Sequence, residues 1–293
     1  MTNQLKIWTL AARPKTLPAA IAPVVMATGM AFGDGIHHWP SAAVAMAAAL
    51  LIQIGTNLAN DYFDFKKGAD TEERKGPTRV TQAGLVSPSG IVAAMTLTFL
   101  LAAACCVWLM LRAGWPIAVI GALSILSGIF YTAGPRPLGY LGLGEIFVLV
   151  FFGPVAVAGT YYVQSFEMNY AVILAGLGPG LLSAAILAVN NLRDIPTDSR
   201  SGKRTLAVRF GKVFAQREYL ALVLLAGALP ALIFALIQDH LGILACVALP
   251  LLAIKSFEDI FTFTDAARLN HTLAATGRLL LLYSVVFVAG WIL

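Results

Sequence analysis

Apolar stretches long enough to cross a lipid bilayer recur along the whole 293-residue chain. An α-helix needs about 20 predominantly apolar residues to cross the hydrocarbon core of a bilayer. We expect nine such helices, of which one is short and interrupted by Pro250. They cover residues near 17–33, 41–59, 90–111, 115–131, 143–163, 170–192, 218–237, 240–256 and 277–293. The pattern predicts an all-α fold, a polytopic membrane bundle that forms a single domain over residues 1–293.

Composition excludes a soluble globular domain. Hydrophobic residues make up 59% of the chain and charged residues only 12%, and the mean hydropathy is +0.80. The three cysteines all lie inside predicted spans and lack the spacing of a zinc site or a redox pair. We therefore expect the cysteines to be buried as small apolar side chains.

The basic residues indicate how the bundle is oriented. With nine spans, all of the 20 Lys and Arg residues except Arg112 fall on one side of the membrane. Cytoplasmic loops of membrane proteins carry an excess of Lys and Arg. We therefore expect a multi-pass protein of the cell membrane (inner or plasma membrane), with its N-terminus in the cytoplasm and its C-terminus outside. The same asymmetry accounts for the net charge of +5, so the charge does not indicate a nucleic-acid partner.

Two of the predicted spans, the second and the sixth, end in similar polar sequences. These are Asn57-Leu-Ala-Asn60-Asp61-Tyr-Phe-Asp64 and Asn190-Asn191-Leu-Arg193-Asp194-Ile-Pro-Thr-Asp198. Amides and carboxylates beside a membrane span are costly, and their default interpretation is a functional site. Because four spans separate the two motifs, both reach the same membrane face. This arrangement predicts an internal parallel repeat of four spans and brings the motifs together on the cytoplasmic side.

Helical spacing places the polar groups of each motif on one face. Residues at i, i+3, i+4 and i+7 share a helix face, and the amides and carboxylates of the first motif fit this template. In the second motif, Asn190 and Asp194 share a face. We expect Pro196 to kink or break the helix and to leave Asp198 in the following loop.

The donor atoms of both motifs indicate magnesium. Carboxylate and amide oxygens without histidine or thiolate clusters suit magnesium rather than zinc. The candidate metal ligands are Asn57, Asn60, Asp61, Asp64, Asn190, Asp194 and Asp198. Magnesium often completes its coordination with water and substrate phosphates.

Basic residues follow each motif, and another lies in the short loop that begins at Tyr131; all of them suit the recognition of phosphate. The candidates are Arg79, Arg136, Lys203 and Arg204. Together with the acidic motifs and the apolar bundle, they predict a site for an anionic headgroup that carries a lipid tail.

Some polar residues allow two interpretations. Glu145 is either stabilised by the N-terminal dipole of the fifth span or faces the cavity as a substrate contact. Tyr62, Tyr131 and Tyr140 either belong to an interfacial aromatic belt or stack on a cation.

The two motifs resemble the aspartate-rich motifs of the intramembrane aromatic prenyltransferases. This superfamily includes the 4-hydroxybenzoate polyprenyltransferases, chlorophyll synthases and haem O synthases, and the resemblance covers nearly the whole chain. It is closest to the branch that prenylates 1,4-dihydroxy-2-naphthoate in menaquinone or phylloquinone synthesis. The closer resemblance is carried by Ala12-Arg13-Pro14-Lys15-Thr16-Leu17, Gly76-Pro77-Thr78-Arg79, Tyr131-Thr-Ala-Gly-Pro and Gly142-Leu-Gly-Glu145.

The resemblance implies a magnesium-dependent enzyme whose helices surround a central cavity, with a cytoplasmic cap and a lateral opening to lipid. Two Mg²⁺ ions would bridge the diphosphate of a polyprenyl donor to the two motifs. In many relatives the first motif ends with an aspartate four residues after the position of Asp64. Here Gly68 stands at that place and Asp70 follows two residues later, a longer spacing that the naphthoate branch shares. Asp70 is thus a further candidate ligand.

The resemblance also assigns roles to individual side chains. The catalytic residues would be Asp61, Asp64, Asp194 and Asp198, and the acceptor-binding residues would be Arg13, Lys15, Tyr131 and Glu145. The reaction would transfer a polyprenyl or phytyl chain from its diphosphate to 1,4-dihydroxy-2-naphthoate. The ring carboxylate would be lost, and the product would be of the demethylmenaquinone type.

Two alternatives remain at this stage. The acceptor could instead be a hydroxybenzoate, a homogentisate or a chlorin, within the same superfamily. From a different class, the acidic stripes could bind the ions of a cation-coupled transporter. A parallel repeat argues against the inverted repeats that many transporters have, and paired acidic motifs next to phosphate-type bases favour an enzyme. The length of the prenyl donor stays open.

Overall fold

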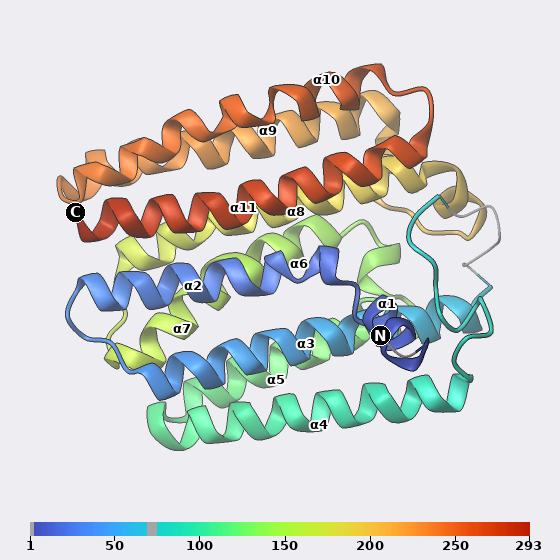
Figure 1. The fold of residues 1–293 in the computed structure, drawn as a ribbon, viewed down its shortest axis with the longest axis horizontal. Coiled ribbons are helices and arrows are strands. Elements are labelled where there is room, and N and C mark those ends of the chain that lie inside the picture. The colour runs from blue at the N-terminus through green and yellow to red at the C-terminus, as the bar shows by residue number, and fades with distance from the viewer. Residues whose placement is uncertain (1–2, 69–74) are drawn as a thin grey trace.

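The computed structural model describes residues 3–68 and 75–293, and those residues form helices and loops without a β-strand. The long helices lie side by side in one bundle (Figure 1). They are α2 (Pro18–Gly33), α3 (Trp39–Lys66), α4 (Pro88–Ala113), α5 (Trp115–Phe130), α8 (Tyr170–Arg200), α9 (Leu206–Ile237) and α11 (Leu269–Ile292).

Shorter helical segments complete the bundle. They are α1 (Asn3–Ala12), η1 (Pro14–Thr16), η2 (Leu138–Tyr140), α6 (Gly144–Val150), η3 (Phe151–Val155), α7 (Ala156–Ser165), η4 (Leu241–Ala253), α10 (Ile254–Thr262) and η5 (Ala266–Arg268). The segments α6, η3 and α7 follow one another as a single span with a π-helical turn in the middle. The segments η4 and α10 form another, in which the residues around Pro250 adopt 3₁₀ geometry.

Each of the nine predicted spans coincides with a helix. Seven helices in the described part of the chain are long and apolar enough to cross a membrane. The segments Gln4–Thr16 and Pro18–Gly33, which meet at an angle of 59°, together form an eighth candidate span. Helix α5 is a shorter apolar helix. The prediction of an all-α polytopic membrane bundle is confirmed, whereas the count of nine spans stays a prediction.

Proline and capping side chains define where the helices begin. Proline occupies one of the first two positions of α2, α3, α4 and α5, where its missing N–H costs nothing. The Ser87 hydroxyl accepts from the Gly90 amide at 3.2 Å at the start of α4, and the Thr205 hydroxyl accepts from the Val208 amide at 3.2 Å at the start of α9. These caps satisfy amides that would otherwise lack partners.

Helix α8 is the most deeply buried of the candidate spans and forms the centre of the bundle. It approaches the broken span through glycines. A Cβ atom on Gly180 would lie 2.4 Å from the Leu149 carbonyl oxygen, and one on Gly153 would lie 2.7 Å from the Gly176 carbonyl oxygen. The close approach of these backbones requires residues without side chains, as in other membrane helix pairs.

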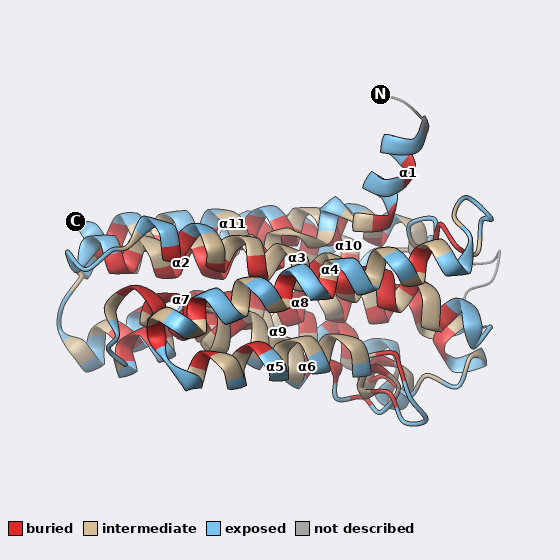
Figure 2. Ribbon diagram, turned by 90° about the horizontal axis from the view of Figure 1, so that it is seen from below, coloured by how far each residue is buried: buried red, intermediate tan, exposed pale blue. Residues whose placement is uncertain are grey.

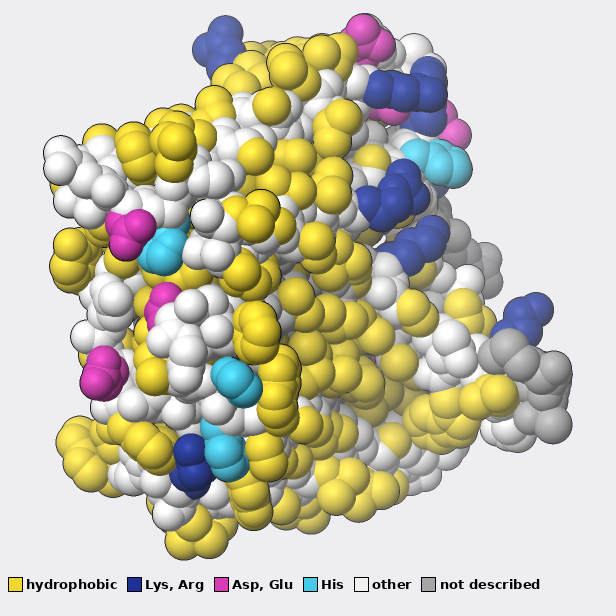
Figure 3. Space-filling view, turned by 60° about the vertical axis from the view of Figure 1, so that its left-hand side comes forward, with side chains coloured by type: hydrophobic (Ala, Val, Ile, Leu, Met, Phe, Trp, Pro, Cys, Tyr) yellow, Lys and Arg dark blue, Asp and Glu magenta, His cyan; other side chains and the backbone are white. Residues whose placement is uncertain are grey.

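The outside of the bundle is apolar. Large hydrophobic side chains such as Leu100, Leu111, Leu225 and Leu251 are exposed, and Figure 2 shows the exposed faces on the outer helices while buried residues line the interior. Figure 3 shows hydrophobic side chains covering much of the flank, with charged groups gathered at the ends. This distribution suits a lipid environment, in which apolar faces need no cover.

The prediction that Pro196 leaves Asp198 in the loop after the helix is wrong, since α8 continues to Arg200. The proline lies within the last turns, so it removes a single hydrogen bond close to a helix end. The Thr197 hydroxyl donates to the Asp194 carbonyl oxygen at 2.9 Å in the same turn. Asp198 therefore stays on the helix, one turn beyond Asp194. Helices α3 and α8 both end at the same end of the bundle (Figure 1).

Candidate active site

A polar cavity lies between the ends of α3 and α8. It encloses about 1140 Å³, including space open to the surroundings. Ten of the predicted site residues line it: Arg13, Asn57, Asn60, Asp64, Arg79, Tyr131, Asn190, Asp194, Asp198 and Lys203. Asp61, Glu145, Lys15, Arg136 and Arg204 do not line it, and Asp70 lies outside the described residues.

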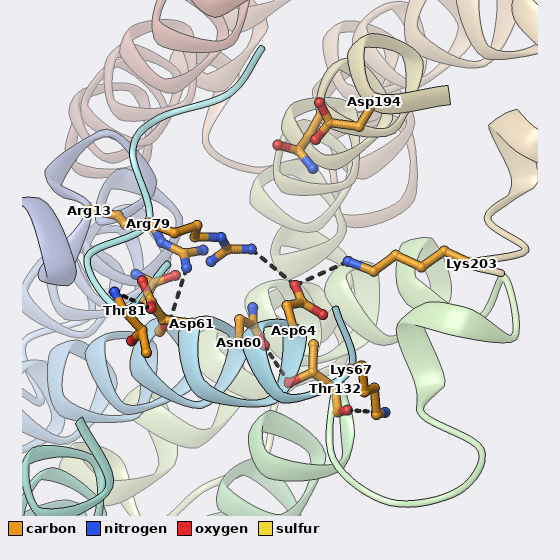
Figure 4. A network of polar contacts seen from close by, with 12 residues as sticks. Arg13, Asn60, Asp61, Asp64, Lys67, Arg79, Thr81, Thr132, Asp194 and Lys203 are labelled. Atoms are coloured by element: carbon orange, nitrogen blue, oxygen red, sulfur yellow. Dashed lines mark hydrogen bonds and ion pairs between the residues drawn. The ribbon is translucent and has the colours of Figure 1, made fainter. Parts of the chain in front are cut away.

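Asp64 is the meeting point of the first motif with the basic residues. Its Oδ2 atom lies 3.1 Å from an Arg79 guanidinium nitrogen and 3.0 Å from the Lys203 Nζ atom, and its Oδ1 atom accepts from the Tyr140 hydroxyl at 3.1 Å. Asp64 and Arg79 are buried. Figure 4 shows the two cations reaching this carboxylate from opposite sides. Two cations and one carboxylate leave net positive charge, which favours an anionic ligand.

Asp61 is placed differently from the prediction. Its Oδ2 atom accepts from the Val80 amide at 3.1 Å and its Oδ1 atom accepts from the Thr81 amide at 3.0 Å. The side chain is buried and points to the loop after the motif, away from the cavity wall (Figure 4). Asp61 lies at the edge of the polar face of α3, where the backbone amides of Val80 and Thr81 bind it. Asp61 thus holds this loop to α3.

The two asparagines of the first motif line the cavity next to Asp64. The Asn57 side-chain amide donates to the Ala12 carbonyl oxygen and to the Thr16 hydroxyl, both at 3.0 Å. Its side-chain oxygen accepts no hydrogen bond from a described residue. The Asn60 side-chain oxygen accepts from the Thr132 hydroxyl at 2.9 Å. Asn57 therefore ties the bend between α1 and α2 to the site.

The second motif contains a buried ion pair that sequence reasoning missed. The guanidinium of Arg193 lies against both oxygens of Asp194, at 2.8 and 2.7 Å. It also donates to the side-chain oxygens of Asn190, at 2.6 Å, and Asn270, at 2.8 Å. Arg193 is 2% exposed. The sequence did contain a signal for this ion pair, because an arginine at the end of a membrane span, next to an aspartate, is expected to pair with a carboxylate.

Glu145 stands behind the cavity wall. Its Oε1 atom accepts from the side-chain amide of Asn191 at 2.6 Å, and its Oε2 atom is buried without a hydrogen-bond partner. Asn191 lines the cavity. Glu145 is not among the residues that line the cavity, and it lies in the first turn of α6, where an acid interacts favourably with the helix dipole. Through its hydrogen bond to Asn191, Glu145 supports a side chain that lines the cavity.

Tyr131 and Tyr140 both line the cavity. The Tyr140 ring lies 5.1 Å from the Lys203 Nζ atom and 4.7 Å from the Lys67 Nζ atom. The interpretation of Tyr140 as a ring stacked on a cation is confirmed.

Three predicted basic residues point elsewhere. Arg136, Arg204 and Lys15 are exposed. Arg204 contributes its backbone, because its amide donates to the Tyr140 carbonyl oxygen at 3.0 Å. The directions of these three side chains depend on the backbone geometry of the loops, which the pattern of charges in the sequence does not encode. Arg13 does line the cavity, and its guanidinium donates to the Asn57 carbonyl oxygen at 3.1 Å.

An apolar cavity adjoins the polar one. It encloses about 1080 Å³, including open space, and is lined by α2, α3, α4, α5 and the broken span of α6, η3 and α7. Five residues belong to both cavities: Gln53, Thr56, Tyr131, Val148 and Phe152. Phe147 and Phe151 stack along one wall with ring centroids 5.9 Å apart. The two cavities together suit a ligand with an anionic head and an apolar chain.

The carboxylate and amide oxygens of the cavity suit magnesium only if a further ligand completes its coordination. Among residues 3–68 and 75–293, no three His, Cys, Asp or Glu side chains converge on one point that could hold a metal alone. Asp64 and Asn60 stand on one wall, and Asp194 and Asp198 stand on the other. Magnesium is commonly bound by one or two carboxylates together with substrate phosphates. The residues present therefore suit a metal that arrives with, or is completed by, a diphosphate.

Comparison with known proteins agrees with this geometry. A model of the UbiA prenyltransferase family matches residues 20–271. The chain is 40% identical to the 1,4-dihydroxy-2-naphthoate octaprenyltransferase of Mycobacterium tuberculosis, over 97% of this chain and 95% of that protein. It is 38% identical to the Escherichia coli 1,4-dihydroxy-2-naphthoate octaprenyltransferase, over 98% and 96%. It is 30% identical to human UbiA prenyltransferase domain-containing protein 1, over 98% and 83%.

Solved structures share the fold. A UbiA homolog from Archaeoglobus fulgidus bound to GPP and Mg²⁺ superposes with a TM-score of 0.65 at 15% identity, covering 98% of this chain and 100% of that one. A digeranylgeranylglyceryl phosphate synthase gives a TM-score of 0.66 at 15% identity, covering 99% of both chains. The matches in sequence, spanning nearly the whole chain, and the shared fold place this multi-pass membrane protein in the UbiA prenyltransferase family.

Proposed function

We propose that the chain transfers the polyprenyl group of an allylic diphosphate to 1,4-dihydroxy-2-naphthoate. The ring carboxylate leaves as CO₂, and the product is a demethylmenaquinone-type compound. The observation that carries this proposal is the junction of a polar cavity, lined by both Asn/Asp motifs, with an apolar cavity. Relatives at 38–40% identity over nearly the full length are 1,4-dihydroxy-2-naphthoate octaprenyltransferases, which favours this acceptor over the other acceptors of the superfamily.

The donor diphosphate occupies the polar cavity in this proposal. Arg79 and Lys203 converge on Asp64 and offer positive charge to phosphate oxygens that approach it. Two Mg²⁺ ions would be held by Asn60 and Asp64 on one wall and by Asn190, Asp194 and Asp198 on the other. Bound magnesium neutralises the charge that develops on the departing diphosphate. The Arg193 guanidinium keeps the Asp194 carboxylate in one orientation.

The prenyl chain lies in the apolar cavity. Tyr131, Val148 and Phe152 stand where the two cavities meet, at the level where the allylic carbon leaves the diphosphate. Breaking the carbon–oxygen bond produces a carbocation, and these apolar and aromatic walls keep water away from it. Helix α5, which packs on α3 and α4, and helix α6, which packs on α8, both line this cavity. In this proposal, long tails reach lipid between α5 and α6.

The acceptor ring attacks the carbocation at the carbon that carries the carboxylate. A carbon–carbon bond forms, the bond to the carboxylate breaks, and its electron pair restores the aromatic ring, so no base is needed at that carbon. Arg13 is the cavity-lining cation that would anchor the carboxylate. Lys15, which is exposed, loses this role.

The orientation and the internal symmetry belong to the same proposal. The N-terminus and the active site face the cytoplasm, where the basic residues gather, and the C-terminus lies outside. The parallel repeat of four spans brings each Asn/Asp motif to the same end, which is supported by the position of both motifs on one cavity.

The test uses the purified chain in lipid vesicles with magnesium, a labelled polyprenyl diphosphate and a panel of aromatic acids. Product is expected with 1,4-dihydroxy-2-naphthoate, and its formation should stop when magnesium is chelated and resume when magnesium is restored. Product with 4-hydroxybenzoate in place of the naphthoate would reassign the acceptor. A folded protein that releases no diphosphate with any acceptor would refute the enzymatic proposal and leave ion-coupled transport to be examined.

A further inference from the structure

A separate groove lies between α10 and α11, away from the proposed active site. It encloses about 920 Å³, including open space, and shares no lining residue with the polar cavity. Four of its nine lining residues carry basic side chains or imidazole: Lys255, Arg268, His271 and Arg278. Among the described residues that line it, one is acidic, Asp259. The groove therefore has an excess of positive charge.

The basic groups face one another from two helices. Arg268, at the end of η5, and His271 and Arg278, on α11, recur at spacings of three and seven and so share a face. Lys255 lies across the groove on α10. Arg268 is paired with Asp259 at 3.2 Å. Lys255, His271 and Arg278 form no hydrogen bond or ion pair with another residue in the described part of the chain. Figure 3 shows Lys, Arg and His side chains gathered at this end of the molecule.

A buried hydroxyl also lines the groove. Thr272 is 1% exposed, and its Oγ1 atom is buried without a hydrogen-bond partner. A buried polar atom without a partner costs about 1–3 kcal/mol. A ligand with acceptor oxygens would satisfy this hydroxyl, the imidazole of His271 and the cations of Lys255 and Arg278 together. A phosphate group has such oxygens.

The groove continues into a neighbouring cavity. The two share Leu252, Ser256, Ala275 and Arg278, and the neighbouring cavity extends along the apolar side chains of Leu279 and Leu282. Arg278 stands at the start of the apolar stretch of the last span, which is the depth at which phospholipid headgroups meet hydrocarbon. Basic residues beside spans commonly serve topology alone. That role requires neither a lysine on α10 that faces the basic residues of η5 and α11 nor a buried hydroxyl in the same groove.

We propose that this groove binds the phosphate headgroup of an anionic phospholipid, with an acyl chain along Leu279 and Leu282. Basic pockets between membrane helices on the cytoplasmic side are suited to such headgroups. The site is independent of the prenyl diphosphate, because the two cavities have no residue in common.

Native mass spectrometry of the delipidated full chain tests the proposal. Phosphatidylglycerol and phosphatidylcholine with identical acyl chains are titrated into the wild type and into Lys255→Gln, Arg278→Gln and Arg217→Gln variants. Arg217 is exposed on α9 outside the groove and serves as the matched control. We expect phosphatidylglycerol to bind more tightly than phosphatidylcholine. Each groove variant should weaken that binding about fivefold, while the control leaves it unchanged.

Thr272→Val provides a second variant with nearly the same shape. It should weaken phosphatidylglycerol binding while the thermal unfolding of the lipid-free protein is unchanged or improved, because the unpaired hydroxyl is gone. Equal binding of the two lipids would overturn the proposal, and so would equal losses in Arg278→Gln and Arg217→Gln. Displacement of the lipid by millimolar inorganic phosphate would also overturn it, by identifying a site for free phosphate.

Discussion

The Oδ2 atom of Asp64 lies 3.0 Å from the Nζ atom of Lys203, a residue 139 positions further along the chain. This contact joins the first Asn/Asp motif to the loop that follows the second. Arg79, from the loop after the first motif, reaches the same oxygen. One carboxylate thus connects both halves of the site, and the cations that would receive the diphosphate are already placed beside the proposed metal ligand.

Substitution of Asp64 by Asn should abolish the proposed reaction. The amide cannot supply the negative charge that a magnesium ion requires, and charge stabilisation of the leaving diphosphate is the largest electrostatic task of the reaction. We expect turnover to fall by at least about a hundredfold, and Asp194→Asn should behave in the same way. Product formation is measured in lipid vesicles, with circular dichroism to show that the helices are intact. Full activity in either variant would remove that aspartate from the metal site.

Asp61→Asn provides the contrast, because Asp61 binds two backbone amides of the loop at Val80 and Thr81. The amide side chain can accept only one of these bonds with its oxygen, so the loop should be less firmly held. We expect a stability loss of about 1–3 kcal/mol, with the magnesium concentration for half-maximal activity unchanged. Thermal unfolding and a magnesium titration check this. A lost magnesium response at undiminished stability would restore Asp61 to the metal site.

The difference between these two aspartates shows what the sequence could and could not predict. The spans followed from hydropathy, and the meeting of the motifs followed from counting spans. Helical spacing placed Asn57, Asn60, Asp61 and Asp64 on one broad face, and this template is too wide to separate a cavity residue from its neighbour. The loop amides that capture Asp61 lie about 20 residues away in the chain. Such contacts are set by tertiary structure, which local patterns do not encode.

The basic residues show the same limit. Positive charge near the motifs predicted phosphate ligands, but Arg79 and Lys203 line the cavity whereas Arg136 and Arg204 are exposed. All four lie in or beside loops, and a loop's backbone decides where its side chains point. Arg193 was overlooked because its charge fits the general excess of basic residues on this side. Its burial follows from packing between α8 and α11.

Arg193→Gln should destabilise the bundle strongly. The substitution leaves the Asp194 carboxylate buried without its guanidinium partner, and breaking a buried ion pair in this way costs about 3–5 kcal/mol. Asp194→Asn together with Arg193→Gln should cost less than the sum of the two single changes, because neither charge is then left alone. Unfolding in mild detergent gives the double-mutant cycle. Additive losses would show that the two side chains do not stabilise one another.

A bulky residue in the apolar cavity should discriminate between donors by length. Ile120 lines the cavity on α5, eleven residues before Tyr131, which is about 16 Å along the helix. Ile120→Trp should block the path of a long prenyl chain while a geranyl group, which ends closer to Tyr131, still fits. We expect kcat/KM for octaprenyl diphosphate to fall about tenfold or more, and that for geranyl diphosphate to change less than about threefold. Val119 is exposed on the lipid side of the same helix, so Val119→Trp should leave both values unchanged. Equal losses for the two donors in Ile120→Trp would mean that the tail takes another path.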